Sequence, residues 1–280
     1  MSEPVLLVEK SEGITTVTLN RPRVMNALSI ELRDSLRQAF ADLGKDAETG
    51  VVIITGAGRA FCAGLDLKEL SSKGIGVDDS TAIPTGESFF INTREFEPPI
   101  IGAINGAAVT GGFELALMCD ILIASTEAVF ADTHARVGVI PGAGLSQKLS
   151  RLIGIYRAKE LSLTGNFISA AQAEAWGLVN RVVQPDELMP TCRALAKDII
   201  SCPSDVVRKY KRLINEGFDR TFSEGIKLET EVFVNHAREV TAQAVAARRD
   251  AVEDRGRAQK EQGQENPLRE KNSSQPTSNT

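Results

Sequence analysis

The segment from residue 107 to 144, AAVTGGFELALMCDILIASTEAVFADTHARVGVIPGAG, carries the features that decide the fold and the site. Its Gly-Gly pair, Gly111 and Gly112, opens an apolar run that is typical of a helix. The first amides of a helix have no partner within it, so they favour an anion or a developing oxyanion, and glycine lets a ligand approach them closely. Glu114 lies one turn further on, and His134, one of only two histidines, follows it by twenty residues.

Outside this segment the chain alternates between strand and helix patterns. Continuous apolar runs predict strands covered on both faces, and they are VVIITG (51–56), IIGAI (100–104) and ILIAS (121–125). Near the N-terminus, two strands are expected around a turn at Glu12-Gly13, followed by a helix over 29–44 with Ser29 as its N-cap. Strands separated by helices favour an α/β architecture with crossover connections.

Helical periodicity dominates from about residue 145 onward, with LVNRVV (178–183) as the one strand-like interruption. The last clear helix is predicted from Thr221 to Arg238, with more helix around 244–259. The run that begins at Gly111 is expected to stay helical through Cys119.

Two segments of the chain predict no regular structure. Residues 71–99 are rich in Gly, Ser, Thr, Asp and Pro and predict a long mobile stretch that could cap a pocket. The polar residues from 262 to 280 predict a disordered tail.

Charge and composition exclude several classes of partner. A net charge of -5 and a pI near 5.3 argue against nucleic acid or an anionic membrane surface, and no apolar run approaches the length of a membrane span. The cysteines lie too far apart in the sequence for a zinc or redox motif, so we expect reduced thiols, no metal and a cytoplasmic protein without a secretory leader. They are Cys62, Cys119, Cys192 and Cys202.

A second glycine segment, TGAGRAFCAGLDLKEL (55–70), first suggests a dinucleotide fingerprint. That fingerprint fails because Phe61 stands at its third glycine position. Ala63 and Gly64 instead lie between a strand and a helix that begins near Asp66, where backbone N–H groups can point into a cleft. Two backbone amides from two loops, with a carboxylate beside them, make an oxyanion hole with an adjacent base.

Five segments, in order, give the chain a family resemblance. They are NRPRVMNALS, GAGRAFCAGLDLKEL, INGAAVTGGFELALMCDILIA, ARVGVIPGAGLSQKLSRLIG and AQAEAWGLVNRVV. Together they resemble the signatures of the enoyl-CoA hydratase/isomerase (crotonase) superfamily over roughly residues 5–240. The resemblance implies a spiral of ββα units in a core over 1–200, followed by a helical region over 201–261 that assembles homotrimers, often paired into hexamers.

The resemblance also implies roles for particular positions. An acyl-CoA thioester would bind with its carbonyl between the amides of Leu65 and Gly111, and Glu114 would hold the attacking water. Further expected contacts to water or substrate, most of them along the coenzyme A moiety, are at Gly142, Ala63, Asn26, Ala27, Leu28, Asp66 and Lys68. Coenzyme A would be part of the substrate, and no separate cofactor is implied.

His134 departs from the family pattern, because hydratases of this family carry a second glutamate four residues before the glycine that matches Gly138. Imidazole exchanges protons near neutral pH, and a nearby carboxylate would favour its charged form. His134 is therefore either the second catalytic group or a pocket residue that only forms hydrogen bonds. Asp132 and Arg136 either pair with it or cap a turn, and the turn is the favoured interpretation. His236 is expected at the surface or an interface.

The predicted function is an enoyl-CoA hydratase that adds water to trans-2-enoyl-CoA, a lyase of fatty acid metabolism such as β-oxidation. Three alternatives stay open. They are an enoyl-CoA isomerase, a hydrolase of a carbon–carbon or thioester bond, and an acyl-CoA-binding protein with weak catalysis.

Overall fold

The computed structural model describes residues 3–73 and 95–261, and the chain divides into two compact units. The first unit runs from residue 1 to 214 and the second from 215 to 280, so the division falls inside helix α9, Ser204–Phe218. The sequence predicts this division earlier, after residue 200. The first part of α9 belongs to the core because Lys211 Nζ lies 2.8 Å from Asp120 Oδ2 and 2.9 Å from the Pro98 carbonyl oxygen.

The larger sheet has six strands in the order β1-β2-β3-β5-β7-β10. Their bounds are Leu6–Ser11, Ile14–Leu19, Val51–Gly56, Ile100–Ile104, Ile121–Ser125 and Arg181–Val183. β1 and β2 form the predicted antiparallel pair around Glu12-Gly13, and the remaining neighbours are parallel. The three continuous apolar runs occupy β3, β5 and β7, which confirms the prediction that they are strands covered on both faces.

The smaller sheet has four strands in the order β4-β6-β8-β9, with bounds Ala60–Cys62, Ala107–Val109, Val129–Ala131 and Phe167–Ser169. Each central strand of the larger sheet is followed by one strand of the smaller sheet and then by a helix. These helices are α2 (Leu67–Lys73), α3 (Gly111–Ala116) and α4 (His134–Val137). The chain therefore winds as a spiral of ββα units, as expected.

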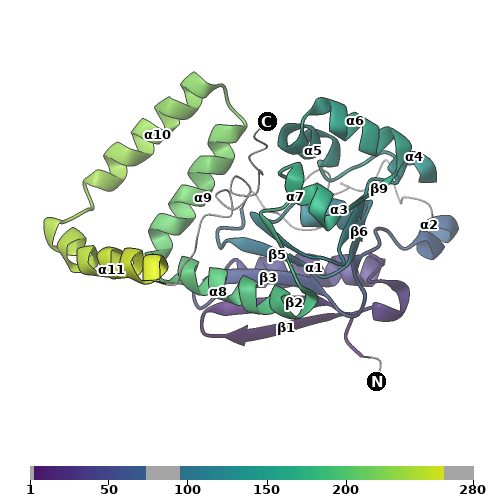
Figure 1. Ribbon diagram of the computed structural model, residues 1–280, viewed down its shortest axis with the longest axis horizontal. Helices are drawn as coiled ribbons and strands as arrows, with labels where there is room; N and C mark the ends of the chain where they lie inside the picture. Colours follow the sequence, from purple (N-terminus) through teal and green to yellow (C-terminus); the bar gives the residue numbers. More distant parts are fainter. Residues whose placement is uncertain (1–2, 74–94, 262–280) are drawn as a thin grey trace, which may run out of the picture. The chain divides into compact units, whose positions relative to one another are not determined.

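The two faces of β3 bury their side chains in two different cores. Val52 and Ile54 pack with Leu32 and Phe40 of α1 (Ile30–Leu43) in the larger core. Val51 and Ile53 lie in a second core, which α8 (Leu188–Ile200) covers through Leu188, Cys192 and Ala196. Figure 1 shows α8 lying along the larger sheet. This double covering explains why the strand has no polar face.

Further helices of the first unit follow the predicted periodicity. They are α5 (Leu145–Ile153), α6 (Ile155–Thr164) and α7 (Ala170–Ala175). The Ser29 hydroxyl accepts a hydrogen bond from the Leu32 amide at 3.2 Å, which confirms Ser29 as the N-cap of α1. None of the helices within residues 3–73 and 95–261 is long and apolar enough to cross a membrane.

Two local predictions were wrong. α3 ends at Ala116 and not at Cys119, because the Met118 and Cys119 amides donate to carbonyls three residues back, in a tighter turn. Strand β9 was not predicted, since it has three residues and two of them are exposed. Most of the stretch 71–99 and the tail 262–280 lie outside the described residues.

The second unit, taken by itself, contains the end of α9 with α10 (Phe222–Ala237) and α11 (Ala242–Glu261). Thr221 and Glu224 form a capping box at the start of α10, and Arg238 is its C-cap, so the predicted bounds of this helix are confirmed. Phe222 and Phe233 of α10 are 86% and 68% exposed within the single chain.

Candidate active site

Two glycine loops meet at the site, one after β4 and one after β6. A Cβ atom placed on Gly112 would lie 2.0 Å from the Cys62 carbonyl oxygen, and one placed on Gly64 would lie 3.1 Å from the Gly111 nitrogen. Both positions therefore require glycine for the close approach of the two loops, and Gly64 also has a positive φ of 91°. This contact brings Leu65, directly after Gly64, next to the start of α3.

The amides of Leu65 and Gly111 are the predicted oxyanion donors. Leu65 lies opposite Leu28 in an isolated parallel bridge, in which the Leu28 amide donates to the Gly64 carbonyl and the Asp66 amide donates to the Leu28 carbonyl. Gly111 begins α3. Within the described part of the chain neither amide has a backbone acceptor. The two N–H groups are thus available to a carbonyl oxygen of a ligand.

The backbone turns sharply at Thr110, immediately before Gly111. Thr110 has φ 54° and ψ −114°, which is a strained conformation for a β-branched residue. Its amide donates to the Ala131 carbonyl at 2.9 Å, and its hydroxyl contacts that of Thr133, so the parallel pairing of β6 with β8 holds the turn. Strain of this kind concentrates at functional sites, and here it aims the first amides of α3.

Glu114 is 4% exposed and lies in the first turn of α3. Its Oε1 accepts a hydrogen bond of 2.7 Å from the Ala143 amide, in the loop before α5. The predicted contact of the Gly142 backbone with the attacking water stays a prediction, and the neighbouring Ala143 amide adds a hydrogen bond to the carboxylate that was not predicted. No side-chain pattern in the sequence marks Ala143, because its contribution is a backbone group.

His134 lies opposite Glu114, with its Nε2 3.5 Å from Glu114 Oε2. His134 is 6% exposed, and its Nδ1 lies 2.6 Å from Asp132 Oδ1. Burial acts to lower the pKa of His134, but hydrogen bonds with Asp132 and Glu114 outweigh it and raise the pKa to about 9. The imidazole is therefore a cation at neutral pH, placed between two carboxylates.

Asp132 pairs with the histidine ring, so the favoured interpretation of Asp132 as only a turn cap was wrong. Its Oδ1 also accepts the His134 backbone N–H at 3.2 Å, so it caps the turn as well. Burial acts to raise the pKa of Asp132, but hydrogen bonds from the His134 ring and the Ser162 hydroxyl hold it below the usual value. Arg136 is exposed and its side chain lies against Gly165.

The strand register explains how residues twenty positions apart meet. β6 and β8 are parallel neighbours, with Val109 opposite Ala131. The helices that follow the two strands, α3 and α4, therefore begin side by side. Glu114 and His134 lie in these first turns and face each other.

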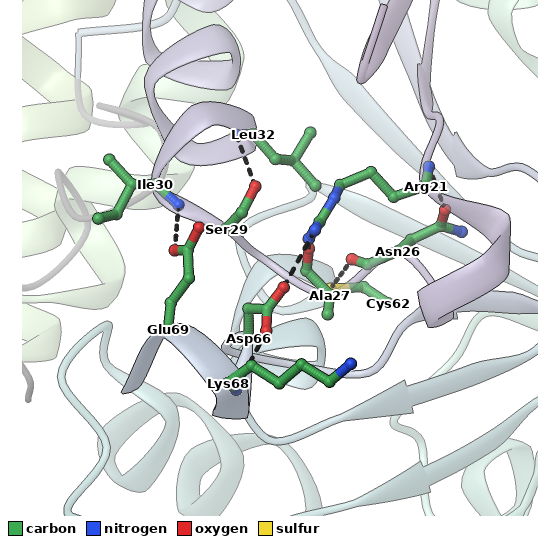
Figure 2. A network of polar contacts seen from close by, with 10 residues as sticks. All are labelled: Arg21, Asn26, Ala27, Ser29, Ile30, Leu32, Cys62, Asp66, Lys68 and Glu69. Atoms are coloured by element: carbon green, nitrogen blue, oxygen red, sulfur yellow. Dashed lines mark hydrogen bonds and ion pairs between the residues drawn. The ribbon is translucent and has the colours of Figure 1, made fainter. Parts of the chain in front are cut away.

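The residues expected along coenzyme A form a polar network beside the loop after β4 (Figure 2). Arg21 donates to the Ala27 carbonyl, and its guanidinium lies 3.0 Å from Asp66 Oδ2. Asn26 is fully buried, and its side chain bonds the Arg21 amide and the Ala57 and Ala60 carbonyls. The Asn26 amide also donates to the Arg21 carbonyl at 3.0 Å, and its carbonyl accepts from the Cys62 thiol at 3.2 Å, so Asn26 holds the loops together through both its side chain and its backbone.

Other predicted contact positions take different places around this network. Leu28 is 1% exposed and belongs to the larger core. The Ala63 amide donates to the Met25 carbonyl at 2.9 Å. Lys68 is exposed, and its backbone amide donates to Asp66 Oδ1 at 3.2 Å, while its side chain extends away from the network in Figure 2. The Arg21–Asp66 ion pair had not been singled out from the sequence.

Comparison with known proteins agrees with this arrangement. The model of the enoyl-CoA hydratase/isomerase family matches residues 9–256. A protein of Arabidopsis thaliana named probable enoyl-CoA hydratase 1, peroxisomal, is 43% identical over 82% of this chain and 86% of its own.

Solved structures also resemble the chain closely. The enoyl-CoA hydratase of Mycobacterium smegmatis is 43% identical and covers 85% of this chain and 98% of its own, with a TM-score of 0.69. That of Bacillus anthracis is 34% identical over 89% of this chain and 96% of its own, with a TM-score of 0.79. The fold and these relatives place the chain among enzymes that act on acyl-CoA thioesters. The chain belongs to the enoyl-CoA hydratase/isomerase family.

Proposed function

We propose that this protein is an enoyl-CoA hydratase that adds water across the double bond of a trans-2-enoyl-CoA thioester. The observation that carries the proposal is the facing pair of Glu114 Oε2 and His134 Nε2, 3.5 Å apart, close to the two available amides. The names of the relatives support the same reaction. A site of this kind can hold one water molecule against an activated double bond.

The first part of the mechanism is polarisation of the thioester. The carbonyl oxygen binds to the amides of Leu65 and Gly111, which stabilise the negative charge that develops on it when water attacks. One such donor commonly contributes about 3 kcal/mol to stabilisation of the transition state. Withdrawal of electrons toward this oxygen makes the β-carbon electrophilic.

The second part is the addition itself. Glu114 Oε1 is held by the Ala143 amide, so Oε2 is the oxygen that accepts a proton from the water as its oxygen bonds to the β-carbon. His134, a cation at neutral pH, gives the proton of Nε2 to the α-carbon. Glu114 thus acts as the base and His134 as the acid.

Loss of the absorbance of the conjugated thioester tests the proposal, with crotonyl-CoA and longer trans-2-enoyl-CoAs as substrates. Glu114→Gln should lower kcat by about 10³-fold, because the amide cannot accept the proton. Glu174→Gln is the matched control, since Glu174 also accepts a backbone N–H, from Val182 at 3.0 Å, outside the site. Equal rates for wild type and Glu114→Gln would refute the assigned role.

Other products would replace the proposal by one of its alternatives. Conversion of a 3-enoyl-CoA into the conjugated 2-enoyl-CoA, without hydration, would mean an isomerase. Cleavage of a carbon–carbon bond or release of free coenzyme A would mean a hydrolase. Binding of acyl-CoA without turnover at any chain length would mean a binding protein.

We also propose that the protein assembles as a homotrimer, or as a pair of trimers, through its C-terminal helices. The exposed aromatic side chains of α10, Phe222 and Phe233, support this, because apolar side chains of this size are normally covered in an assembly. Analytical ultracentrifugation tests it, and a monomer at micromolar concentration would refute it. The cytoplasmic location stays a prediction, supported by four free cysteines.

A further inference from the structure

Asp132 stands behind His134, on the side of the imidazole away from Glu114. It is 2% exposed, directly after β8, and it accepts hydrogen bonds from the ring, the backbone of His134 and the Ser162 hydroxyl of α6. The hydration scheme above gives it no part. The 2.6 Å distance between this buried carboxylate and the ring of the candidate acid is that of a strong, charge-assisted hydrogen bond.

We propose that Asp132 is a positioning residue that keeps Nε2 of His134 directed at Glu114, so that the proton taken by Glu114 returns directly to His134. This inference rests on the proposed hydration and deepens it. Its basis is that each member of the pair has one atom anchored and one atom facing the other. Ala143 anchors Glu114 Oε1, and Asp132 anchors His134 Nδ1, which leaves Oε2 and Nε2 opposite each other.

The ionised carboxylate of Asp132 also determines the tautomer of the neutral histidine. A carboxylate only accepts hydrogen bonds, so Nδ1 must stay protonated whether the imidazole is charged or neutral. The neutral ring consequently has its bare nitrogen at Nε2, which faces Glu114. With the opposite tautomer, the bare nitrogen would face Asp132 and could not take a proton from Glu114.

The protons balance over one turnover. At the start Glu114 is a carboxylate and His134 an imidazolium. An O–H bond of water breaks and its proton goes to Glu114 Oε2, while the oxygen bonds to the β-carbon and Nε2 gives its proton to the α-carbon. Glu114 is then an acid and His134 a neutral imidazole. Transfer from Oε2 to Nε2 restores both groups, across a separation that catalytic hydrogen bonds commonly close when substrate is bound.

Few other charged groups of the described residues act on this ring. Glu114 faces it from α3 and Asp132 from the end of β8, while α6 contributes only the uncharged Ser162, through Asp132. Arg136, on the histidine's own helix, points to Gly165. Removal of the Asp132 charge is therefore expected to act directly on the titration of His134.

The test is Asp132→Asn, followed first by NMR titration of histidine labelled in the imidazole ring. The chain has two histidines, so His236→Gln assigns the two signals. In the wild type the His134 signal should titrate near pH 9, and in Asp132→Asn its pKa should fall by about one to three units. The high-pH limb of kcat for hydration should move down by the same amount, with KM changed less than about twofold, since the coenzyme A contacts are untouched.

Three controls separate positioning from folding. Asp120→Asn removes another carboxylate that holds a backbone N–H, that of Ile100 at 2.7 Å, and should reduce stability without moving either pH curve. In a His134→Gln background, Asp132→Asn should change kcat less than about twofold, because Asp132 acts through the histidine. If Asp132→Asn fails to fold, Ser162→Ala removes a donor from the same carboxylate, which makes that carboxylate a stronger acceptor, so the pKa of His134 and the high-pH limb of kcat should both move upward.

Two results would overturn the inference. If the pKa of His134 is unchanged in Asp132→Asn, Asp132 does not position the histidine. If that pKa shifts but the high-pH limb of kcat does not move, His134 does not take back the proton from Glu114. A wild type that hydrates no enoyl-CoA, but whose His134 titration depends on Asp132, would refute the proposed function and leave Asp132 as the group that sets the charge of His134.

Discussion

The raised pKa of His134 predicts how the stability of the protein depends on pH. A base that binds its proton more tightly in the folded state stabilises that state fully below its unfolded pKa, near 6.5, and loses the stabilisation as pH rises through the folded pKa, near 9. One pKa unit corresponds to about 1.4 kcal/mol. The difference between the two values therefore sets an upper limit of about 3 kcal/mol.

We expect the protonation of His134 to contribute about 2 kcal/mol to the free energy of unfolding, because solvent screening and the coupling of the ring to Glu114 and Asp132 reduce the upper limit. The perturbation is His134→Gln, which keeps a polar side chain but cannot bind a proton. The free energy of unfolding of wild type minus that of the variant should fall by this amount between pH 6.5 and 9.

Urea unfolding at a fixed protein concentration, at several pH values from 6 to 9, measures this difference. The buried thiols of Cys62 and Cys192, whose pKa burial raises to about 12, also make stability depend on pH. Their contribution is common to both proteins and cancels in the subtraction. A difference that stays constant over this pH range would refute the idea that His134 is held as a cation.

Three further changes have definite expected outcomes. Gly112→Ala would place a methyl group 2.0 Å from the Cys62 carbonyl oxygen, so we expect the free energy of unfolding in urea to fall by about 2 to 3 kcal/mol and kcat to fall as well. A methyl group in Gly142→Ala meets nothing within 4 Å, so its effect should be far milder. Ser29→Ala removes the α1 cap and should cost about 1 kcal/mol in thermal unfolding, with kcat unchanged. Lys211→Met should lower the melting temperature by leaving Asp120 without its cation, and an unchanged value would contradict that role.

Local patterns were sufficient for the elements that this fold buries. The apolar runs of β3, β5 and β7 are continuous because helices or a second sheet cover both faces. An unbroken apolar run distinguishes these strands from surface strands, in which apolar and polar residues alternate. Ser29 marked the start of α1 because an N-cap is a property of a few neighbouring residues. β9, with three residues, had too few positions to show any period.

The candidate site was predictable where it depends on backbone glycines and on chain order. Gly111 and Glu114 lie in one helical turn, so their proximity follows from local geometry. His134 could be assigned to the same site only through the resemblance to known hydratases, because it comes from another repeat of the spiral. Its meeting with Glu114 depends on the parallel register of β6 and β8.

The sequence by itself determined which chemical groups are present and which short elements carry them. Tertiary structure alone decided how those groups are paired. The Ala143 amide binds Glu114, and Glu114 faces His134, because the spiral brings separate turns of the chain to one point. The physical reason is range: helix caps, buried strands and the pairing of Asp132 with His134 are set by residues a few positions apart, whereas the contact of His134 with Glu114 exists only after the repeats have packed.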